Sequence, residues 1–494
     1  MANEVDVSKC LPSARFMFGR KVIKSSAKAV TAENVLDVLF KALEKHYVNQ
    51  GEIQYLWDYY KGRQPILKRV KDVRPEICNK IVENRANEIV SFKVGYLCGE
   101  PIQYVSRRGQ EDITDKVIKL NEYMFEEGKA AKDQEIVEWQ MICGTAFRLV
   151  LPKSENLGDD SPFEIYTLDP RETFVVYSNE VGMRPLMAVK YVVDTDTKIT
   201  SYSVYTKDMY YLIEDGVIKS MVPHALGVVP IFEYPANNAR LGSFEIVLPL
   251  LDSINNIASN RLDGVEQTVQ AFIKFINCDI TAEDFLKLKD LGAIKVKSVD
   301  GANADVDIVK NNLNQDQSQT LKNDLYSSVL TICGIPNRNG GSSTSDTGAA
   351  VLLRDGWSLA EARAKDSENI FKKSEKEMLR LVLKILKEIQ GIDISIKDID
   401  MKFTRRNYEA IQSKSQVLIS MLAQPKIHPL LAFEHSGLFT DPENAYLQSM
   451  KYYEEQLKKW EPIEVDEEFG GDEEDVSGDG QVSYEAKKED KKRV

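Results

Sequence analysis

The feature that most constrains the fold is a long apolar stripe in the middle of the chain. Between residues 243 and 277, apolar side chains recur at steps of three and four, the spacing of one helix face. A helix of roughly 30 residues would be about 45 Å long, because each residue adds about 1.5 Å. Few globular domains need such a helix. The stripe consists of Val247, Leu250, Leu251, Ile254, Ile257, Leu262, Val265, Val269 and Phe272.

A second helix is predicted to return alongside the first. Residues 279–312 form a compact piece with a short helix at 282–291 and strand candidates at 293–297 and 306–309. A helix at 315–332 follows, with its own apolar stripe. Two helices that flank a small insertion place that insertion at the far end of a stalk.

The chain before the stalk predicts helices followed by a β-rich lobe. Apolar residues at helical spacing indicate helices at 31–60, 77–97 and 131–143. From 146 to 235, short β-rich runs are broken by Gly, Pro, Asp and Asn turns. The predicted strands are 147–151, 174–177, 187–193, 202–206 and 210–214.

A polar loop and a long helix are predicted after the stalk. The sequence Gly-Ile-Pro at 334–336 ends the returning helix, and residues 337–347 are rich in Gly and Ser and lack an apolar anchor. The stretch 348–390 then predicts a third long helix, with one apolar stripe in its second half. Gly356 is interpreted as a kink in this helix.

The C-terminal part predicts one strand, several helices and a charged tail. Residues 392–403 alternate apolar and polar side chains, which is typical of a strand. Helices are predicted at about 407–422, 428–434 and 442–460. The tail 461–494 is charged and poor in apolar residues, so we predict that it is disordered.

The charge of the chain argues against a broadly basic nucleic-acid surface. The net charge is −13, and the tail 461–494, with 13 acidic and 5 basic residues, accounts for −8 of it, which leaves −5 for the rest. DNA would therefore be contacted weakly, unless a local basic patch intervenes. No apolar run of membrane-spanning length and no secretory signal occurs, so synthesis in a cytoplasm is expected.

Sequence motifs of catalysis and metal binding are missing. No G-x-x-x-x-G-K-[ST] string, H-E-x-x-H string or G-x-S-x-G string occurs, and the six cysteines form no C-x-x-C pair. We therefore predict no catalytic residue, no metal site and no cofactor. Basic residues concentrate in the stalk insertion, where they form either a solvated helix face or a positive rim for DNA or an acidic partner. They are Lys287, Lys289, Lys295 and Lys297.

Several short strings occur in a characteristic order along the chain. They are Asn79-Lys80-Ile81-Val82, Tyr96-Leu97-Cys98-Gly99-Glu100-Pro101-Ile102, Gly144-Thr145-Ala146, Asp169-Pro170, Val229-Pro230-Ile231, Leu250-Leu251-Asp252-Ser253-Ile254-Asn255, Gly334-Ile335-Pro336 and Thr347-Gly348-Ala349-Ala350. Together they resemble the portal proteins of long-tailed phages that infect Gram-positive bacteria. Thr347 stands where that family usually has serine. The resemblance extends from about residue 30 to 460.

The resemblance implies an α+β fold with the portal-protein architecture, assembled as a ring. Long stem helices would carry a β-containing wing and clip and a helical crown. The implied regions are an N-terminal arm (1–30), wing (31–242), stem helix (243–277), clip (278–312), second stem helix (313–334), tunnel loop (335–347), long bent helix with a wing strand (348–403), crown (404–460) and acidic disordered tail (461–494).

The resemblance also implies a function. Such a protein forms a ring, commonly a dodecamer, at one capsid vertex of the virion, through which double-stranded DNA is packaged and ejected. It would assemble in the host cytoplasm with scaffold and major capsid protein, and without a membrane. The lysines of the clip would dock the terminase large subunit and later a head-completion adaptor. The ATP would be hydrolysed by the terminase.

The tunnel loop would touch the passing DNA. Its implied contact residues are Asn337, Arg338, Asn339, Gly340, Ser342, Ser343, Thr344 and Ser345, of which Arg338 is the one cation. Two rival interpretations remain at this point. One is another ring component of a capsid or tail, and the other is a DNA-processing enzyme with an unrecognised site. The two long helices that flank a small insertion favour the portal interpretation.

Overall fold

The fold is described from a computed structural model. It covers residues 18–107, 111–153, 160–269, 272–276, 278–279, 297–298, 305–309, 315–337, 356–405, 410–439 and 441–460. The chain divides into a large unit, Met1–Glu443, and a small unit, Asn444–Val494. Everything described below except helix α12 belongs to the large unit. The predicted N-terminal arm lies mostly outside the described residues, and the predicted tail lies entirely outside them.

Helices dominate the first part of the chain. They are α1 (Val35–Tyr60), the 3-10 helix η3 (Pro65–Lys68), α2 (Arg85–Cys98), α3 (Glu111–Glu126) and α4 (Lys129–Cys143). The predictions of α1 and α4 are confirmed, whereas α3 was not predicted. The helix predicted at 77–97 is wrong at its start, because residues 77–84 are not helical.

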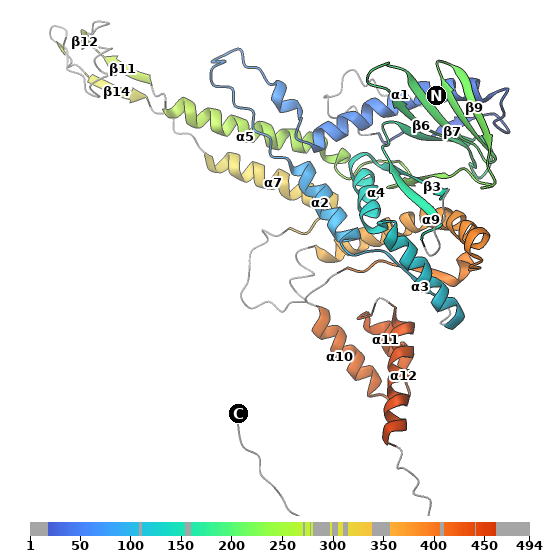
Figure 1. The fold of residues 1–494 in the computed structure, drawn as a ribbon. Coiled ribbons are helices and arrows are strands. Elements are labelled where there is room, and N and C mark those ends of the chain that lie inside the picture. Colours follow the sequence, from blue (N-terminus) through green and yellow to red (C-terminus); the bar gives the residue numbers. More distant parts are fainter. Residues whose placement is uncertain are drawn as a thin grey trace, which may run out of the picture. The chain divides into compact units, whose positions relative to one another are not determined.

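Two sheets form the β-rich lobe (Figure 1). The larger sheet has the order β1-β5-β6-β7-β8-β9, with β1 parallel to β5 and the other pairs antiparallel. Its strands are β1 (Ile23–Ser25), β5 (Thr173–Ser178), β6 (Pro185–Val193), β7 (Thr200–Tyr205), β8 (Met209–Glu214) and β9 (Val217–Pro223). The smaller sheet consists of β10 (Ile231–Pro235), β3 (Thr145–Pro152) and β4 (Phe163–Leu168). All five predicted strands overlap observed ones.

Strands β5 and β6 of the larger sheet are buried on both faces, because their side chains alternate between two cores. Leu39 and Leu43 of α1 pack with Val189 and Tyr211 in one cluster. Val175 and its neighbours form the other cluster with the smaller sheet. Alternation of this kind is what a strand buried on two faces requires.

The long helix α9 (Trp357–Gln390) follows the segment that was predicted as a polar loop, most of which lies outside the described residues. Gly356 caps its N-terminus with φ 83°, so the predicted kink at this residue is wrong. The strand predicted at 392–403 is shorter in the structure, where the 3-10 helix η5 (Ile396–Asp398) precedes β15 (Ile399–Lys402). The partner of β15 is β2 (Gln103–Ser106), in the segment before the lobe.

Two adjacent helices form the predicted stalk. They are α5 (Leu248–Val269), preceded by the 3-10 helix η4 (Glu245–Val247), and α7 (Gln315–Cys333). The helix predicted at 243–277 is too long, because residues 272–276 form strand β11 (Phe272–Ile276), which pairs with β14 (Asp305–Val309). A second small pair is β12 (Cys278–Asp279) with β13 (Lys297–Ser298). The predicted helix at 282–291 lies outside the described residues.

Three helices end the described chain. They are α10 (Ala410–Leu422), α11 (Pro429–Ser436) and α12 (Pro442–Trp460), and each overlaps a predicted helix. The helices α10 and α11 are joined by a hydrogen bond from Lys414 Nζ to the carbonyl oxygen of Gly437, at 3.0 Å.

Candidate functional site

The paired helices α5 and α7 share a core with the lobe. Ile254 of α5 and Val329 of α7 are fully buried in one cluster, which also contains Tyr59 of α1. Near the insertion the contact becomes polar, since Arg261 Nε donates to Gln315 Oε1 at 2.9 Å. Apolar packing therefore fixes the pair to the lobe, and hydrogen bonds join the helices near the insertion.

Two glycines stand at the ends of the segment between α7 and α9. Gly334 has φ 69° and Gly356 has φ 83°, in the left-handed region that glycine enters at little cost. A Cβ atom on Gly356 would lie 3.9 Å from the Cα atom of Pro336. The segment between α7 and α9 therefore begins and ends at neighbouring points of the fold.

Residues 77–84, here called the strap, run antiparallel along α5. Side chains on one face of α5 accept the backbone N–H groups of alternate strap residues. These contacts are Asn79 N to Asp263 Oδ1 at 2.8 Å, Ile81 N to Ser259 Oγ at 2.9 Å, and Glu83 N to Asn255 Oδ1 at 2.9 Å. The contacts replace the hydrogen bonds that a helix would have given this backbone.

The match between the strap and α5 is geometric. Alternate residues of an extended chain are about 6.6 Å apart, and residues four apart in a helix are about 6 Å apart. Three successive contacts can therefore form without distortion. The accepting residues Asn255, Ser259 and Asp263 are buried. Because a buried backbone donor without an acceptor is costly, these side chains determine where the strap lies.

Charged contacts reinforce the strap. Asp263 Oδ2 is 3.1 Å from Arg69 Nη2 and 3.0 Å from Lys71 Nζ. Burial opposes the charge of Asp263, but hydrogen bonds from Asn79 and Lys71 outweigh it and hold the pKa of this carboxyl below its usual range. On α7, Lys322 pairs with Glu83 of the strap. The strap is thus bound to both helices of the pair.

Arg20 lies where the N-terminal segment crosses between α1 and the start of α5. Its Nε atom is 2.9 Å from Glu52 Oε2, and its Nη2 atom forms an ion pair with Glu245. Glu245 also accepts the N–H of Gly242. The side chains of Arg20 and Glu245 are 1% and 0% exposed. Burial raises the pKa of Glu245 to about 7, and Arg20 limits the rise.

Three backbone segments cross closely beside this ion pair, and each needs a glycine. A Cβ atom on Gly144 would overlap the carbonyl oxygen of Arg240, and Gly19 and Gly242 would meet the carbonyls of Ala239 and Ile142 in the same way. The crossing joins the N-terminal segment, the α4–β3 turn and the chain that leads to α5. It therefore connects the lobe to the paired helices.

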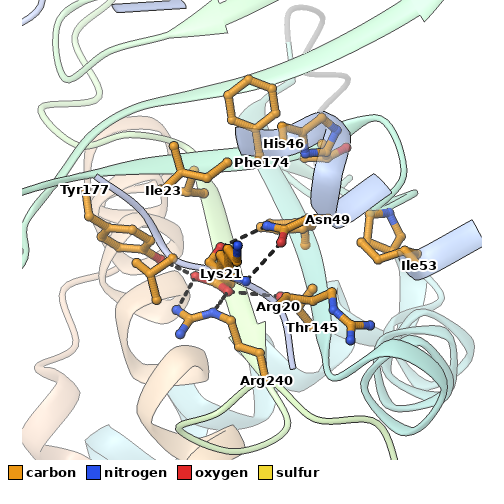
Figure 2. A pocket seen from close by; sticks show the side chains of 16 residues that line it. Arg20, Lys21, Ile23, His46, Asn49, Ile53, Thr145, Phe174, Tyr177 and Arg240 are labelled. Atoms are coloured by element: carbon orange, nitrogen blue, oxygen red, sulfur yellow. Dashed lines mark hydrogen bonds and ion pairs between the residues drawn. The ribbon is translucent and has the colours of Figure 1, made fainter. Parts of the chain in front are cut away.

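A cavity of about 30 Å³ lies at this crossing (Figure 2). Asn49 closes one side, where its Oδ1 accepts the Lys21 N–H at 2.9 Å and its Nδ2 donates to the Lys21 carbonyl at 2.8 Å. The cavity has room for about two water molecules. It is too small for a nucleotide or another substrate-sized ligand.

A second group of buried charges joins α4, β3 and α9. It comprises Lys129, Asp133, Arg148 and Glu375, two cations and two anions. Arg148 is 2.7 Å from Asp133 and 3.2 Å from Glu375, and Lys129 is 2.6 Å and 2.9 Å from the same carboxylates. Burial acts to raise the pKa of Glu375, but Lys129 and Arg148 hold it below its usual range. The group fixes α9 to the lobe.

Comparison with known proteins assigns the chain to a family. The family model for phage portal proteins of the SPP1 Gp6-like type matches residues 41–464, most of the chain. The chain belongs to this portal protein family. A chain from the solved neck of an empty GTA particle, computed with C6 symmetry, is 10% identical with a TM-score of 0.43 and covers 72% of this chain and 90% of its own. No curated protein sequence matches.

The family assignment gives the general role of the protein. A portal protein is a structural component of the phage particle at its portal vertex, where it serves DNA packaging, and it is not an enzyme. Within the described residues, no three His, Cys, Asp or Glu side chains are grouped closely enough to hold a metal ion. Of the helices in the described ranges, none combines the length and apolar character needed to cross a membrane.

The predicted contact residues of the portal protein lie largely outside the described residues. Of the predicted contact residues in the tunnel loop, only Asn337 is described, and it lies just after Pro336. The other predicted residues are Arg338, Asn339, Gly340, Ser342, Ser343, Thr344 and Ser345. In the insertion, Lys297 is in β13. Lys287, Lys289 and Lys295 are outside the described ranges.

The sequence interpretation missed the polar face of α5. The signal was present, since Asn255, Ser259 and Asp263 recur every four residues in this helix. Polar side chains at that spacing share one face and need partners when that face is buried. The identity of the partner was not readable, because the strap is more than 170 residues away in the chain.

Proposed function

We propose that this portal protein assembles into a ring, commonly a dodecamer, whose central channel passes double-stranded DNA into and out of a capsid. One observation carries the proposal: α5 and α7 form an adjacent pair with a small β insertion between them and a strap across both. Helices held along their length in this way suit the wall of a channel. The phages would be long-tailed and infect Gram-positive hosts.

The regions of the portal architecture can be assigned to observed elements. We propose α5 and α7 as the stem and the β11–β14 insertion as the clip, so that the clip begins at Phe272 instead of residue 278. The lobe and the helices before it would form the wing, which β15 rejoins through β2. The helices α10 to α12 would form the crown, which faces the capsid interior.

The loop between Asn337 and Thr347 is proposed to touch the duplex in transit. Its residues are small and polar, and a moving duplex must not be held, because each tight phosphate contact adds a barrier to sliding. Both ends of the segment meet at Pro336 and Gly356, so a change within it need not disturb the helices on either side.

The clip is proposed to dock the terminase large subunit during packaging and a head-completion adaptor afterwards. The four lysines of the insertion would provide a positive rim for an acidic partner. Scaffold and major capsid protein would contact the portal during assembly in the host cytoplasm. The finished ring would remain in the virion.

Electron microscopy of the purified full chain tests the ring. We expect class averages with a central channel wide enough for duplex DNA. Deletion of Asn339–Ser345 should then impair packaging or DNA retention while rings persist, because the deletion lies within a loop. Rings lost together with the loop would contradict the loop assignment.

A charge reversal tests the clip. Replacing Lys287, Lys289, Lys295 and Lys297 with Glu should weaken binding of terminase or adaptor to purified rings. A matched control with Gln at the same positions should weaken it less, since it removes charge without adding repulsion. Binding that is equal in both variants and the unchanged protein would refute the proposed docking role.

A further inference from the structure

One face of α9 carries a row of cations that the proposed channel does not use. Lys373, Lys376, Arg380, Lys384 and Lys387 follow one another at steps of three or four residues. Residues at this spacing share one side of a helix. The row is about 21 Å long, at about 1.5 Å per residue.

This row faces solvent in the large unit. The side chains of Arg380, Lys384 and Lys387 are 56%, 40% and 61% exposed. Lys373 and Lys376 are exposed as well. The opposite side of the helix is buried, including Met378 and Val382 of its apolar stripe and the carboxylate of Glu375. The row therefore stands apart from the contacts that fix α9 to the lobe.

Most cations of the row form no ion pair or only exposed ion pairs. Lys373 and Lys376 form no hydrogen bond or ion pair within the described part of the chain. Arg380 pairs with Glu377 at 2.5 Å, and Lys387 pairs with Asp393 at 2.8 Å, all through exposed side chains.

Such exposed pairs contribute about 0–1 kcal/mol and can exchange partners. Lys384 is the exception, because its Nζ also donates to the carbonyl of Ala225 at 2.7 Å.

The positive charge extends beyond the row. Burial lowers the pKa of Lys372, the nearby charges of Lys402 and Lys376 lower it further, and Asp400 acts in the opposite direction. From 372 to 388, six cations outnumber the two exposed acids, which are Glu377 and Glu388. A chain with a net charge of −13 thus carries a local surface of the opposite sign.

We propose that this face of α9 binds the phosphate backbone of double-stranded DNA. A duplex carries one phosphate charge per about 1.7 Å of its axis, so a row of about 21 Å spans a length of duplex with about a dozen phosphates, of which those on the near side can be contacted. Contacts of side chains with phosphate are independent of sequence, as packaged DNA of any sequence requires. The proposal rests on the proposed function only in that DNA is the cargo.

The face of α9 and the predicted tunnel loop would treat DNA differently. The loop has one cation, Arg338, which suits a duplex that slides. When DNA binds to a row of adjacent cations, several counterions leave the DNA at once, which favours a duplex that is held in place. We therefore expect the face of α9 to bind DNA at rest.

The proposal is tested by measuring how a duplex of about 30 base pairs binds to the full chain. Fluorescence anisotropy gives the affinity at each concentration of a salt series. The test variant combines Lys373→Gln, Lys376→Gln and Arg380→Gln. Each lost phosphate contact should reduce the slope of log affinity against log salt by about 0.9, so the slope should fall by about 2.7. At the lowest salt, affinity should fall at least about tenfold.

A matched control removes the same charge elsewhere. It combines Lys41→Gln, Lys116→Gln and Lys119→Gln, whose side chains are 72%, 34% and 36% exposed on α1 and α3. Both triple variants have the same net charge. The control should retain the slope of the unchanged protein. An equal loss in both variants would mean that only net charge matters and would overturn the proposal.

Two further outcomes are decisive. Tighter binding of polyglutamate than of the duplex at the same salt, lost in the test variant, would identify an acidic protein as the partner and refute DNA. Electron microscopy of the test variant separates this inference from the channel itself. Intact rings with weakened DNA binding would support the face of α9, whereas unchanged DNA binding would refute it whether or not rings form.

Discussion

Replacing Glu245 with Gln should make the stability of the portal protein less dependent on pH. Glu245 and Glu52 share one guanidinium, that of Arg20, at the junction of the lobe with the paired helices α5 and α7. The cluster therefore has one negative charge in excess when both carboxylates are ionised. A glutamine at 245 keeps an oxygen that can accept the Gly242 N–H and removes the excess charge.

The sign and size of this pH effect on the free energy of unfolding follow from the pKa of Glu245. Its folded value of about 7 lies above the ordinary 4.5, so the folded state binds this proton more tightly than the unfolded state does. The contribution to stability is therefore full below pH 4.5 and is lost as the pH rises through 7. At about 1.4 kcal/mol per pKa unit, the loss by pH 8 is about 3 kcal/mol.

Urea unfolding of both proteins at pH 5 and pH 8 measures this effect. The unchanged protein should lose about 2.5 kcal/mol more than the Glu245→Gln variant between the two pH values, because part of the contribution is already lost at pH 5, while other titrating groups cancel in the comparison. A control is Glu122→Gln on α3, whose side chain is 60% exposed and which should leave the difference unchanged. If the free energy of unfolding changed with pH in the same way in the Glu245→Gln variant and in the unchanged protein, the proposed buried, shared charge would be refuted.

Other perturbations test the remaining contacts. Arg148→Met should lower the free energy of unfolding by about 3–5 kcal/mol, because it leaves buried carboxylates with one cation, and urea unfolding measures it. Asn255→Ala should cost about 1–3 kcal/mol by the same assay, since a buried N–H loses its acceptor, whereas the exposed Asn256→Ala should cost little. Gly144→Ala should lower the melting temperature well beyond Gly182→Ala, because both have positive φ but only Gly144 faces a carbonyl.

Elements with one continuous local pattern were predictable from sequence. The helix α7 (Gln315–Cys333) was predicted at 315–332, because its apolar residues recur at helical spacing and a Gly follows it. Strand β6 (Pro185–Val193) was predicted almost to its ends, as a β-rich run between turn residues. In these cases local propensity and the tertiary environment favour the same structure.

Elements decided by distant partners were not predictable. After α5, the run Phe272–Ile276 has apolar residues that fit a helix or a strand equally well, and pairing with β14 selects the strand. In the strap, Ile77 and Ile81 are spaced as in a helix, yet the backbone there bonds to side chains of α5. The spacing of apolar residues alone cannot reveal a hydrogen-bond acceptor that lies far away in the sequence.

The candidate site was predictable only in outline. The positions of the paired helices follow from periodicity and from Gly334 at the end of α7, but the contacts that support these helices involve buried polar groups. Arg20 lies in a segment without helical or strand pattern, and nothing local indicates that it meets Glu245. The face of α9 likewise becomes visible only once the buried side of that helix is known.

The contacts that support the paired helices α5 and α7 and those that support α9 share one physical property, which is that they are polar and directional. Apolar side chains can slide past one another at little cost, whereas a buried donor that moves away from its acceptor costs about 1–3 kcal/mol. The strap fixes α5 and α7 along their axes, and Arg148 with Glu375 fixes α9. A helix held in register on its buried side can present its exposed side at constant positions. For a row of cations on α9, constant positions are what simultaneous contact with successive phosphates requires.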